Sequence, residues 1–186
     1  MRIIAGQLRG RRLAKIGKGD AGAHLRPTTD RVRESLFSVL THRDVIPGAR
    51  VLDLFAGTGA LGLEALSRGA AHATFVESGR IAQKLLVQNI ELTGTEGQTR
   101  LLRKDARRLG SCDGDPFDLV FLDPPYGQGL GTLALNAAMR GGWISGGALI
   151  VWEESQPMTA PTGCAVLDQR RFGDTHVTLM QPVGDA

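Results

Sequence analysis

The chain is poor in cysteine. Of its 186 residues only Cys112 and Cys164 are cysteines, and they lie far apart with neither a C-x-x-C pattern nor a neighbouring histidine. This scarcity argues against a disulfide framework and against a cysteine-ligated zinc site. The four histidines are scattered as well, so we expect two reduced thiols and no bound metal.

Long hydrophobic runs are also missing. No apolar stretch approaches the roughly 20 residues that cross a membrane, and residues 1–6 lack the apolar core of a signal peptide. We therefore expect a cytoplasmic protein with no membrane partner. The composition, 42% hydrophobic and 22% charged, is typical of one soluble globular domain with a substantial core.

Acidic residues are scarce near the N-terminus. Residues 1–50 carry eleven Lys or Arg against four Asp or Glu, a net charge of +7, whereas residues 51–186 carry eleven against fifteen, a net charge of −4. Part of the basic charge falls in a glycine-bearing run that predicts a short hairpin rather than a helix. Such a cluster can contact RNA phosphates, although a charged face that only keeps a chain soluble is the commoner explanation. The candidate RNA-binding residues in this run are Arg9, Arg11, Arg12 and Lys15.

The clearest chemical signal is Asp123-Pro124-Pro125-Tyr126, directly after the apolar run of residues 118–122. Two consecutive prolines lack backbone N–H groups, so a turn here leaves carbonyl oxygens that no helix or sheet uses. These carbonyls and the Asp123 carboxylate accept hydrogen bonds, which suits the exocyclic amine of a planar base, and the Tyr126 ring can stack on that base. The alternative is that the two prolines end a strand and Tyr126 covers its edge.

A glycine-rich turn lies upstream, between an apolar strand and apolar residues at helical spacing. Its Gly57, Gly59 and Gly62 match the G-x-G-x-x-G pattern of a nucleotide-binding unit, and Glu77 ends the next apolar run, where a ribose-binding acid is expected. A dinucleotide would fit this pattern, but Asp53 places a carboxylate beside the loop. That charge disfavours a pyrophosphate and favours the ammonium and sulfonium groups of S-adenosylmethionine. Close strand–helix packing is the alternative explanation of the glycines.

Strand and helix signals alternate along the rest of the chain. A helix is predicted over residues 28–43, with Thr28 or Thr29 as N-cap and one apolar face made of Val32, Leu36, Phe37 and Leu40. Further helices are predicted near residues 60–69, 79–93 and 129–140. Strands are predicted near residues 50–54, 73–77, 99–104, 118–123 and 147–152.

This alternation predicts an α/β fold with a mostly parallel sheet and helices on both faces. The end of the chain differs, because two strand signals flank Phe172-Gly173-Asp174 and predict an antiparallel hairpin of residues 165–171 and 175–181. The sheet would then have seven strands. We expect residues 1–25 to form a basic N-terminal extension and residues 26–186 to form the main domain.

Three stretches together resemble the RsmD-type family, whose members are bacterial 16S rRNA guanine-N2 methyltransferases. They are Arg26–Phe37 (RPTTDRVRESLF), Asp53–Arg68 (DLFAGTGALGLEALSR) and Asp123–Tyr126 (DPPY), and the similarity extends from Ile3 to the final hairpin. The resemblance implies a class I methyltransferase Rossmann-like fold and S-adenosylmethionine as methyl donor. It also implies 16S rRNA as the substrate. We expect the protein to be a monomer and the RNA to be part of a small-subunit assembly intermediate.

The resemblance implies roles for individual residues as well. The segment Arg26–Arg31 would close over the methionine end of the cofactor, Glu77 would bind the ribose hydroxyls, and Arg31 would join the RNA-binding residues. The candidate catalytic residues, which would hold the target base, are Asp123, Pro124, Pro125 and Tyr126; relatives often have Phe at the last position, and either ring can stack. The candidate cofactor-binding residues are Arg26, Thr28, Thr29, Asp53, Phe55, Ala56, Gly57, Thr58, Gly59, Glu77, Ser78, Asp105, Ala106 and Asp123, of which Asp105 and Ala106 would face the adenine.

Methyl transfer of this kind needs no metal. Most of the acceleration would come from positioning, and acceptors at Asp123 and the Pro124 carbonyl would favour the positive charge that develops on the attacking amine. Asp123 can receive the proton directly or through water, or the product can lose it to solvent. The base must leave its stack to reach such a site, which favours a loop as substrate.

Three alternatives stay open at this point. An adenine-N6 methyltransferase acting on DNA or RNA is the nearest, because the acceptors of residues 123–126 suit either amine. An NAD-dependent oxidoreductase is supported by the glycine pattern alone and is opposed by Asp53 and the final hairpin. A non-catalytic RNA-binding module would explain the basic residues but would give Asp123–Tyr126 no purpose.

Overall fold

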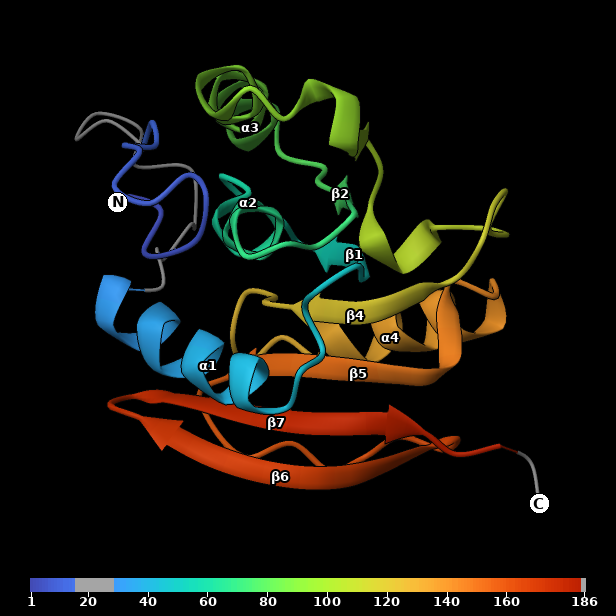
Figure 1. Cartoon of the computed structure of the whole chain (residues 1–186). Helices are drawn as coiled ribbons and strands as arrows, with labels where there is room; N and C mark the ends of the chain where they lie inside the picture. Colours follow the sequence, from blue (N-terminus) through green and yellow to red (C-terminus); the bar gives the residue numbers. More distant parts are fainter. Residues whose placement is uncertain (16–28, 185–186) are drawn as a thin grey trace.

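A seven-stranded sheet forms the centre of the molecule in the computed structural model, which describes residues 1–15 and 29–184 (Figure 1). Its strand order is β3-β2-β1-β4-β5-β7-β6. The parallel part comprises β1 (Arg50–Leu54), β2 (His72–Val76), β3 (Thr99–Leu102), β4 (Phe117–Leu122) and β5 (Ile144–Glu154). The antiparallel part comprises β6 (Cys164–Phe172) and β7 (Thr175–Pro182), with β7 between β5 and β6. The predicted mostly parallel sheet with a final antiparallel hairpin is confirmed.

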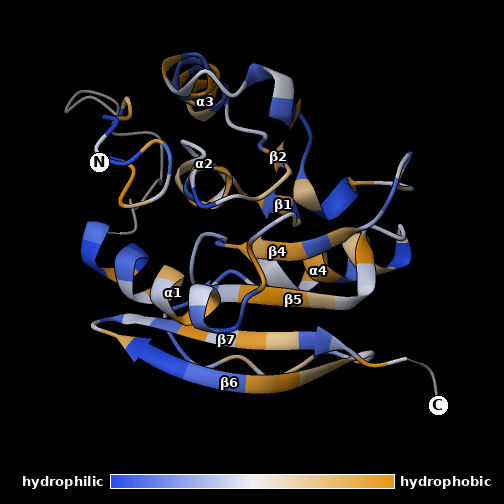
Figure 2. Ribbon diagram, viewed as in Figure 1, coloured by the Kyte–Doolittle hydropathy of each residue, from blue (hydrophilic) through white to orange (hydrophobic). Residues whose placement is uncertain are grey.

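Helices cover both faces of the sheet, as the sequence predicts. One hydrophobic cluster joins one face to α1 (Asp30–His42), α2 (Ala60–Ser67) and α3 (Arg80–Thr93). A second cluster joins the other face to α4 (Leu130–Arg140) and to the 3-10 turn η2 (Ala106–Arg108); a further 3-10 turn, η1 (Glu96–Gln98), precedes β3. Figure 2 shows β4 and β5 mostly in hydrophobic colours and the first turns of α1 in hydrophilic ones. Within the described residues, no helix has the length and apolar character needed to cross a membrane.

Two local predictions differ from the structure. The buried face of α1 consists of Arg33, Leu36, Phe37 and Leu40, whereas Val32 is only half-buried. Arg33 takes a core position because its guanidinium donates to the Arg2 carbonyl and to the Asp30 carboxylate. Strand β5 begins three residues earlier than predicted, because Gly146 and Gly147 lie within a register shift of the β4–β5 pair rather than before the strand.

The register of the parallel strands brings separate segments to one edge of the sheet. Leu54 at the end of β1 is paired with Val76 of β2 and with Leu122 of β4. The residues that follow these three strands therefore leave the sheet side by side. The carboxyl edge of a parallel sheet is where ligands bind in open α/β folds.

Residues 1–15 pack against the main domain. Ile3 is fully buried and Leu13 nearly so, both within the cluster that holds α1, α2 and α3. The predicted hairpin appears as an isolated antiparallel bridge between Arg2 and Arg12. The rest of the predicted extension, residues 16–25, lies outside the described residues. The described part of this basic arm, residues 1–15, is thus built into the domain rather than projecting from it.

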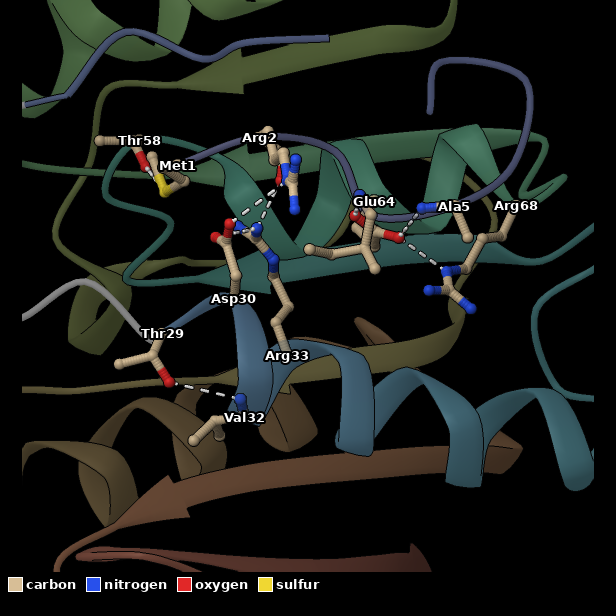
Figure 3. A network of polar contacts seen from close by, with 11 residues as sticks. Met1, Arg2, Ala5, Thr29, Asp30, Val32, Arg33, Thr58, Glu64 and Arg68 are labelled. Carbon is tan, nitrogen blue, oxygen red and sulfur yellow. Dashed lines mark hydrogen bonds and ion pairs between the residues drawn. The ribbon is translucent and has the colours of Figure 1, made fainter. Parts of the chain in front are cut away.

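A polar network fixes the basic arm to α1 and α2 (Figure 3). The Glu64 carboxylate accepts from the backbone N–H groups of Ile4 (2.7 Å) and Ala5 (3.0 Å) and also binds the Arg68 guanidinium at 2.8 Å. Burial lowers the pKa of Arg33, and the nearby carboxylates of Glu64, Asp30 and Glu153 oppose this effect. The arm is therefore positioned by buried charges as well as by apolar contacts.

Candidate active site

The glycine-rich turn between β1 and α2 has a left-handed backbone at Phe55 (φ 61°), Gly57 (φ 57°) and Gly59 (φ 79°). The Glu77 carboxylate, which follows β2, accepts from the N–H groups of Gly57 (2.8 Å) and Gly79 (2.6 Å). Glu77 is 9% exposed, so these bonds lie in a nearly buried site. One acidic side chain thus connects the glycine turn to the start of α3.

Two of the glycines also have a packing role. A Cβ on Gly62 would lie 2.4 Å from the Phe75 ring, and a Cβ on Gly59 would lie 2.3 Å from Leu86 Cδ1. Real Cβ atoms do not approach this closely, so a larger residue at Gly62 would collide with the ring. At Gly59 the left-handed backbone (φ 79°) disfavours a larger residue as well. Close packing of α2 on the sheet, the alternative that the sequence offered, therefore explains Gly62 without any ligand.

Asp53 is buried in β1, with 1% of its surface exposed. Its Oδ2 accepts from the N–H of Gly62 at 3.0 Å, in the first turn of α2. Burial raises the pKa of Asp53 well above its usual value, and the nearby carboxylates of Asp123 and Glu77 raise it further, whereas the bond from Gly62 lowers it. Three acidic side chains from β1, β2 and β4 therefore interact at one edge of the sheet.

This arrangement of acids fits S-adenosylmethionine. Neither Asp53 nor Glu77 forms an ion pair with another described residue, so positive charge brought to this edge would favour the ionised carboxylates. The sulfonium and ammonium groups of the cofactor supply that charge. Each oxygen of Glu77 accepts one backbone N–H and keeps further lone-pair capacity for ribose hydroxyls.

Asp105 caps the η2 turn. Its carboxylate accepts from the Arg107 backbone N–H at 2.9 Å and pairs with the Arg107 guanidinium at 2.6 Å. The hydrogen bonds from the Arg107 side chain lower the pKa of Asp105, and burial opposes the shift. Ala106 is buried in the cluster beneath the turn. These contacts fix the shape of η2, and the contact of Asp105 and Ala106 with adenine stays a prediction.

The remaining predicted cofactor residues lie in different surroundings. Thr29 is the N-cap of α1 and its hydroxyl accepts from the Val32 N–H at 3.3 Å. The Thr58 carbonyl accepts from the buried Asn89 side chain at 2.9 Å, which connects the glycine turn to α3. Ala56 is buried and Ser78 is exposed. Arg26 and Thr28 lie outside the described residues.

The turn Asp123–Tyr126 follows β4 at the same edge. The Asp123 N–H donates to the Leu54 carbonyl at 3.5 Å, so the turn starts beside the end of β1. Pro124 is buried, and its carbonyl accepts no hydrogen bond from a described residue. The Tyr126 hydroxyl lies 3.5 Å from Thr175 Oγ1 at the start of β7. The acceptors and the ring that the sequence predicts are therefore brought together here.

Glu154 is a residue of this site that the sequence reasoning missed. It ends β5 and is 5% exposed, and its Oε1 accepts from the Gly127 N–H at 2.8 Å, directly after Tyr126. Its Oε2 accepts from the N–H and the hydroxyl of Ser155 at 2.6 and 2.9 Å. The only sequence signal is an acidic pair at the end of an apolar strand. Glu154 holds the far end of the turn in place.

The predicted RNA-binding residues are all exposed: Arg9, Arg11, Arg12, Lys15 and Arg31. Arg11 donates to the Leu92 carbonyl at 2.8 Å near the end of α3. The first four side chains belong to the basic arm, whose apolar residues face the core, while Arg31 lies in the first turn of α1. The geometry thus presents these cations to solvent, as binding of an RNA backbone requires.

Comparisons with known proteins find relatives over most of the chain. The family model described as conserved hypothetical protein 95 matches residues 1–181. Ribosomal RNA small subunit methyltransferase D of Escherichia coli K12 is 44% identical over 162 residues, which cover 87% of this chain and 78% of that protein. The protein of the same name from Haemophilus influenzae is 35% identical, and the match covers 97% of this chain and 93% of that protein.

The fold also matches a solved structure. The Escherichia coli protein yhhF, described as a methyltransferase, superposes with a TM-score of 0.83 at 41% identity, and the match covers 98% of this chain and 97% of that one. Its similarity extends over the basic arm, the glycine turn and the final hairpin alike.

Proposed function

The chain belongs to the RsmD family of methyltransferases, and on that premise we propose that it transfers a methyl group from S-adenosylmethionine to the N2 amine of a guanine in 16S rRNA. As the target nucleotide we propose guanine 966, which rests on the family resemblance alone. The observation that carries the proposal is the turn Asp123–Tyr126, which places a carboxylate, an available carbonyl and an aromatic ring beside the glycine turn. The substrate is RNA of the small ribosomal subunit.

The cofactor would lie along the carboxyl edge of β1, β2 and β4. Glu77 would accept from the ribose hydroxyls, and Asp53 and Asp123 would face the charged methionine end. Backbone groups of Gly57, Thr58 and Gly59 would line the loop. When bound, S-adenosylmethionine supplies an electrophilic methyl group.

The residues of this chain act on the target base. The Tyr126 ring stacks on its face, while Asp123 and the Pro124 carbonyl accept from the N2 amine and orient its lone pair. These acceptors stabilise the positive charge that develops on nitrogen more than they stabilise the neutral ground state, which lowers the barrier. Asp123, or a water bound to it, takes the surplus proton.

The basic arm would extend the RNA contact beyond the target base. We assign residues 1–25 to RNA binding and residues 26–186 to the methyltransferase domain. The exposed arginines of the arm suit RNA phosphates, and the buried Glu64 and Ile3 hold the arm that carries them against the domain. The particle that carries the RNA, an assembly intermediate of the small subunit, is part of the same proposal.

Methylation of 16S rRNA from cells that lack this protein tests the proposal. Purified protein, labelled S-adenosylmethionine and either naked 16S rRNA or small-subunit particles are incubated, and the RNA is digested to nucleosides. N2-methylguanine is the expected product. N6-methyladenine would establish the alternative activity instead, since the acceptors of residues 123–126 suit both amines, and absence of any methylated nucleoside from both substrates would refute the proposal.

A further inference from the structure

A cavity of about 550 Å³ lies beside Tyr126, and none of its described lining residues belongs to the glycine turn. Its walls come from three places that are distant in sequence: the start of α1, the turn after β4 and the turn between β6 and β7. The volume lies in the range of pockets that hold one small molecule or one nucleotide. The residues that line it are Thr29, Arg31, Val32, Ser35, Tyr126, Arg171, Phe172, Gly173, Asp174 and Thr175.

The chemistry of this wall suits an anion attached to a planar group. Two arginines, Arg31 on α1 and Arg171 on β6, line the cavity, and Asp174 is the only acid among its described lining residues. Hydroxyl groups of threonine and serine add hydrogen-bonding partners, and the rings of Tyr126 and Phe172 add flat apolar surface. Guanidinium groups bind phosphates, and rings accept bases, so the combination matches a nucleotide.

Arg171 is held in a defined orientation. Its Nε donates to the Gly173 carbonyl at 2.8 Å, across the turn between the two strands. Arg171 forms no ion pair with a described residue, so no carboxylate of the described residues binds its terminal nitrogens. The preceding Arg170 differs, because its Nε binds the Asp168 carboxylate at 2.9 Å. Successive residues of a strand point to opposite faces, which separates the two arginines.

The cavity lies on the same side of the molecule as the other predicted RNA contacts. Figure 1 shows the turn between β6 and β7, the start of α1 and the basic arm together at one side. The Arg2–Asp30 ion pair of 3.7 Å joins the arm to the first turn of α1. The Tyr126 hydroxyl lies 3.5 Å from Thr175 Oγ1, and both residues line the cavity. An RNA strand that follows these surfaces would pass from the arm across α1 to the catalytic turn.

We propose that this cavity binds a nucleotide of single-stranded RNA that adjoins the target base, with Arg171 and Arg31 on its phosphate. The inference rests on the proposed function and adds the turn between β6 and β7 to the RNA-binding surface. A recessed cavity admits an unstacked nucleotide and excludes a duplex. The site therefore favours a target that is displayed in a loop.

The test compares Arg171→Gln with Arg170→Gln, which removes the same charge from the neighbouring position. The probes are a fluorescent RNA hairpin with a guanine in its loop and a fully paired duplex of the same stem. With the hairpin, Arg171→Gln should lower the affinity up to about fivefold at low salt, as loss of an exposed ionic contact does. It should also reduce the log–log salt slope by about 0.7, the value for one phosphate contact to a single strand.

Arg170→Gln should leave the affinity and the slope for the hairpin at the parent values, and the duplex should bind both variants as it binds the parent. Equal losses for the two variants would mean general charge attraction and would overturn the proposal, as would an unchanged slope for Arg171→Gln. Matching melting temperatures exclude misfolding. This test measures RNA binding, so its outcome does not depend on whether the parent methylates guanine. A failure to methylate guanine would refute the proposed function, and it would do so in a separate experiment.

Discussion

The Glu154 side chain at the end of β5 accepts a 2.8 Å hydrogen bond from the backbone N–H of Gly127, so a buried carboxylate fixes the chain directly after Tyr126. Its second oxygen is held by Ser155. The turn Asp123–Tyr126 is therefore anchored at both ends, by β1 through Asp123 and by β5 through Glu154.

Glu154→Gln should lower the rate of methyl transfer with little change in S-adenosylmethionine affinity. Glutamine retains one acceptor oxygen for the Gly127 N–H but turns an NH2 group toward the two donors of Ser155. It also loses the negative charge, and a hydrogen bond to a charged group contributes about 1.5–3 kcal/mol. We expect a fall in single-turnover rate of about tenfold or more, since small displacements of reacting groups are costly. Glu96→Gln, at an exposed position in η1, is the matched control. A rate equal to that of the control would rule out a positioning role.

Asp123→Ala should abolish methyl transfer and keep the dissociation constant of S-adenosylmethionine within a few-fold. The carboxylate is assigned mainly to the amine of the base, so its loss removes an interaction that is strongest in the transition state. Single-turnover rates and calorimetry measure the two quantities. Survival of the rate within tenfold of the parent would contradict the acceptor role.

Glu77→Ala should weaken S-adenosylmethionine binding by at least about tenfold, since each hydrogen bond to a charged group contributes about 1.5–3 kcal/mol. The structure adds a second effect, because the same carboxylate accepts from Gly57 and Gly79. The unliganded variant should therefore also be less stable than the parent. Glu77→Gln keeps one acceptor oxygen and should lose less stability. Unchanged cofactor affinity in both variants would remove Glu77 from the site.

Asp53→Asn should change how stability depends on pH. Burial raises the pKa of Asp53, so the folded state holds its proton more tightly than the unfolded state does. The pKa of such an acid in the unfolded state is about 4. The free energy of unfolding therefore falls as the pH rises from about 4 through the pKa of the folded state. Asparagine keeps an acceptor for the Gly62 N–H but does not ionise. Urea unfolding at several pH values should show that the free energy of unfolding of the variant increases relative to that of the parent as pH rises. The same pH dependence for both proteins would contradict this.

The same substitution should weaken binding of S-adenosylmethionine. Removing a carboxylate from the edge that receives the sulfonium and ammonium groups removes an attraction, which is stronger in a buried site than in water. If Asp53→Asn is more stable than the parent at high pH but binds S-adenosylmethionine more weakly, the buried carboxylate costs stability and contributes to cofactor binding. Calorimetric titration with S-adenosylmethionine at neutral pH measures this second effect.

Local patterns in the sequence sufficed for most of the fold. Apolar periodicity predicts the order of strands and helices, and the acceptors of Asp123–Tyr126 depend only on neighbours in the chain. Glu154 and Arg171 were not found, because each acts across a pairing between distant strands and neither belongs to a local motif. The burial of Arg33 was not predicted for the same reason, since it depends on the Arg2 carbonyl from the basic arm. Long-range partners, rather than propensities, decide such positions.

The basic arm offers the last prediction. Its arginines are exposed, and the buried Ile3 and Leu13 hold the arm in place, so charge can be removed without removing the packing. Of Arg9, Arg11 and Arg12, only Arg11 has a side-chain hydrogen bond to a described residue, the Leu92 carbonyl, and melting temperature monitors the loss of that bond.

Replacing Arg9, Arg11 and Arg12 together with alanine should lower RNA affinity and flatten its salt dependence, by about 0.7 units of log–log slope per phosphate contact to single-stranded RNA. Cofactor affinity should not change, because these side chains point to solvent. Tyr126→Ala is the contrasting variant: it should remove a stacking contact of about 1–3 kcal/mol and leave the slope unaltered, since a ring carries no charge. Measuring both variants over a range of salt concentrations separates phosphate contacts from base contacts. A triple variant with the slope of the parent would mean that the arm only presents a solvated charged face.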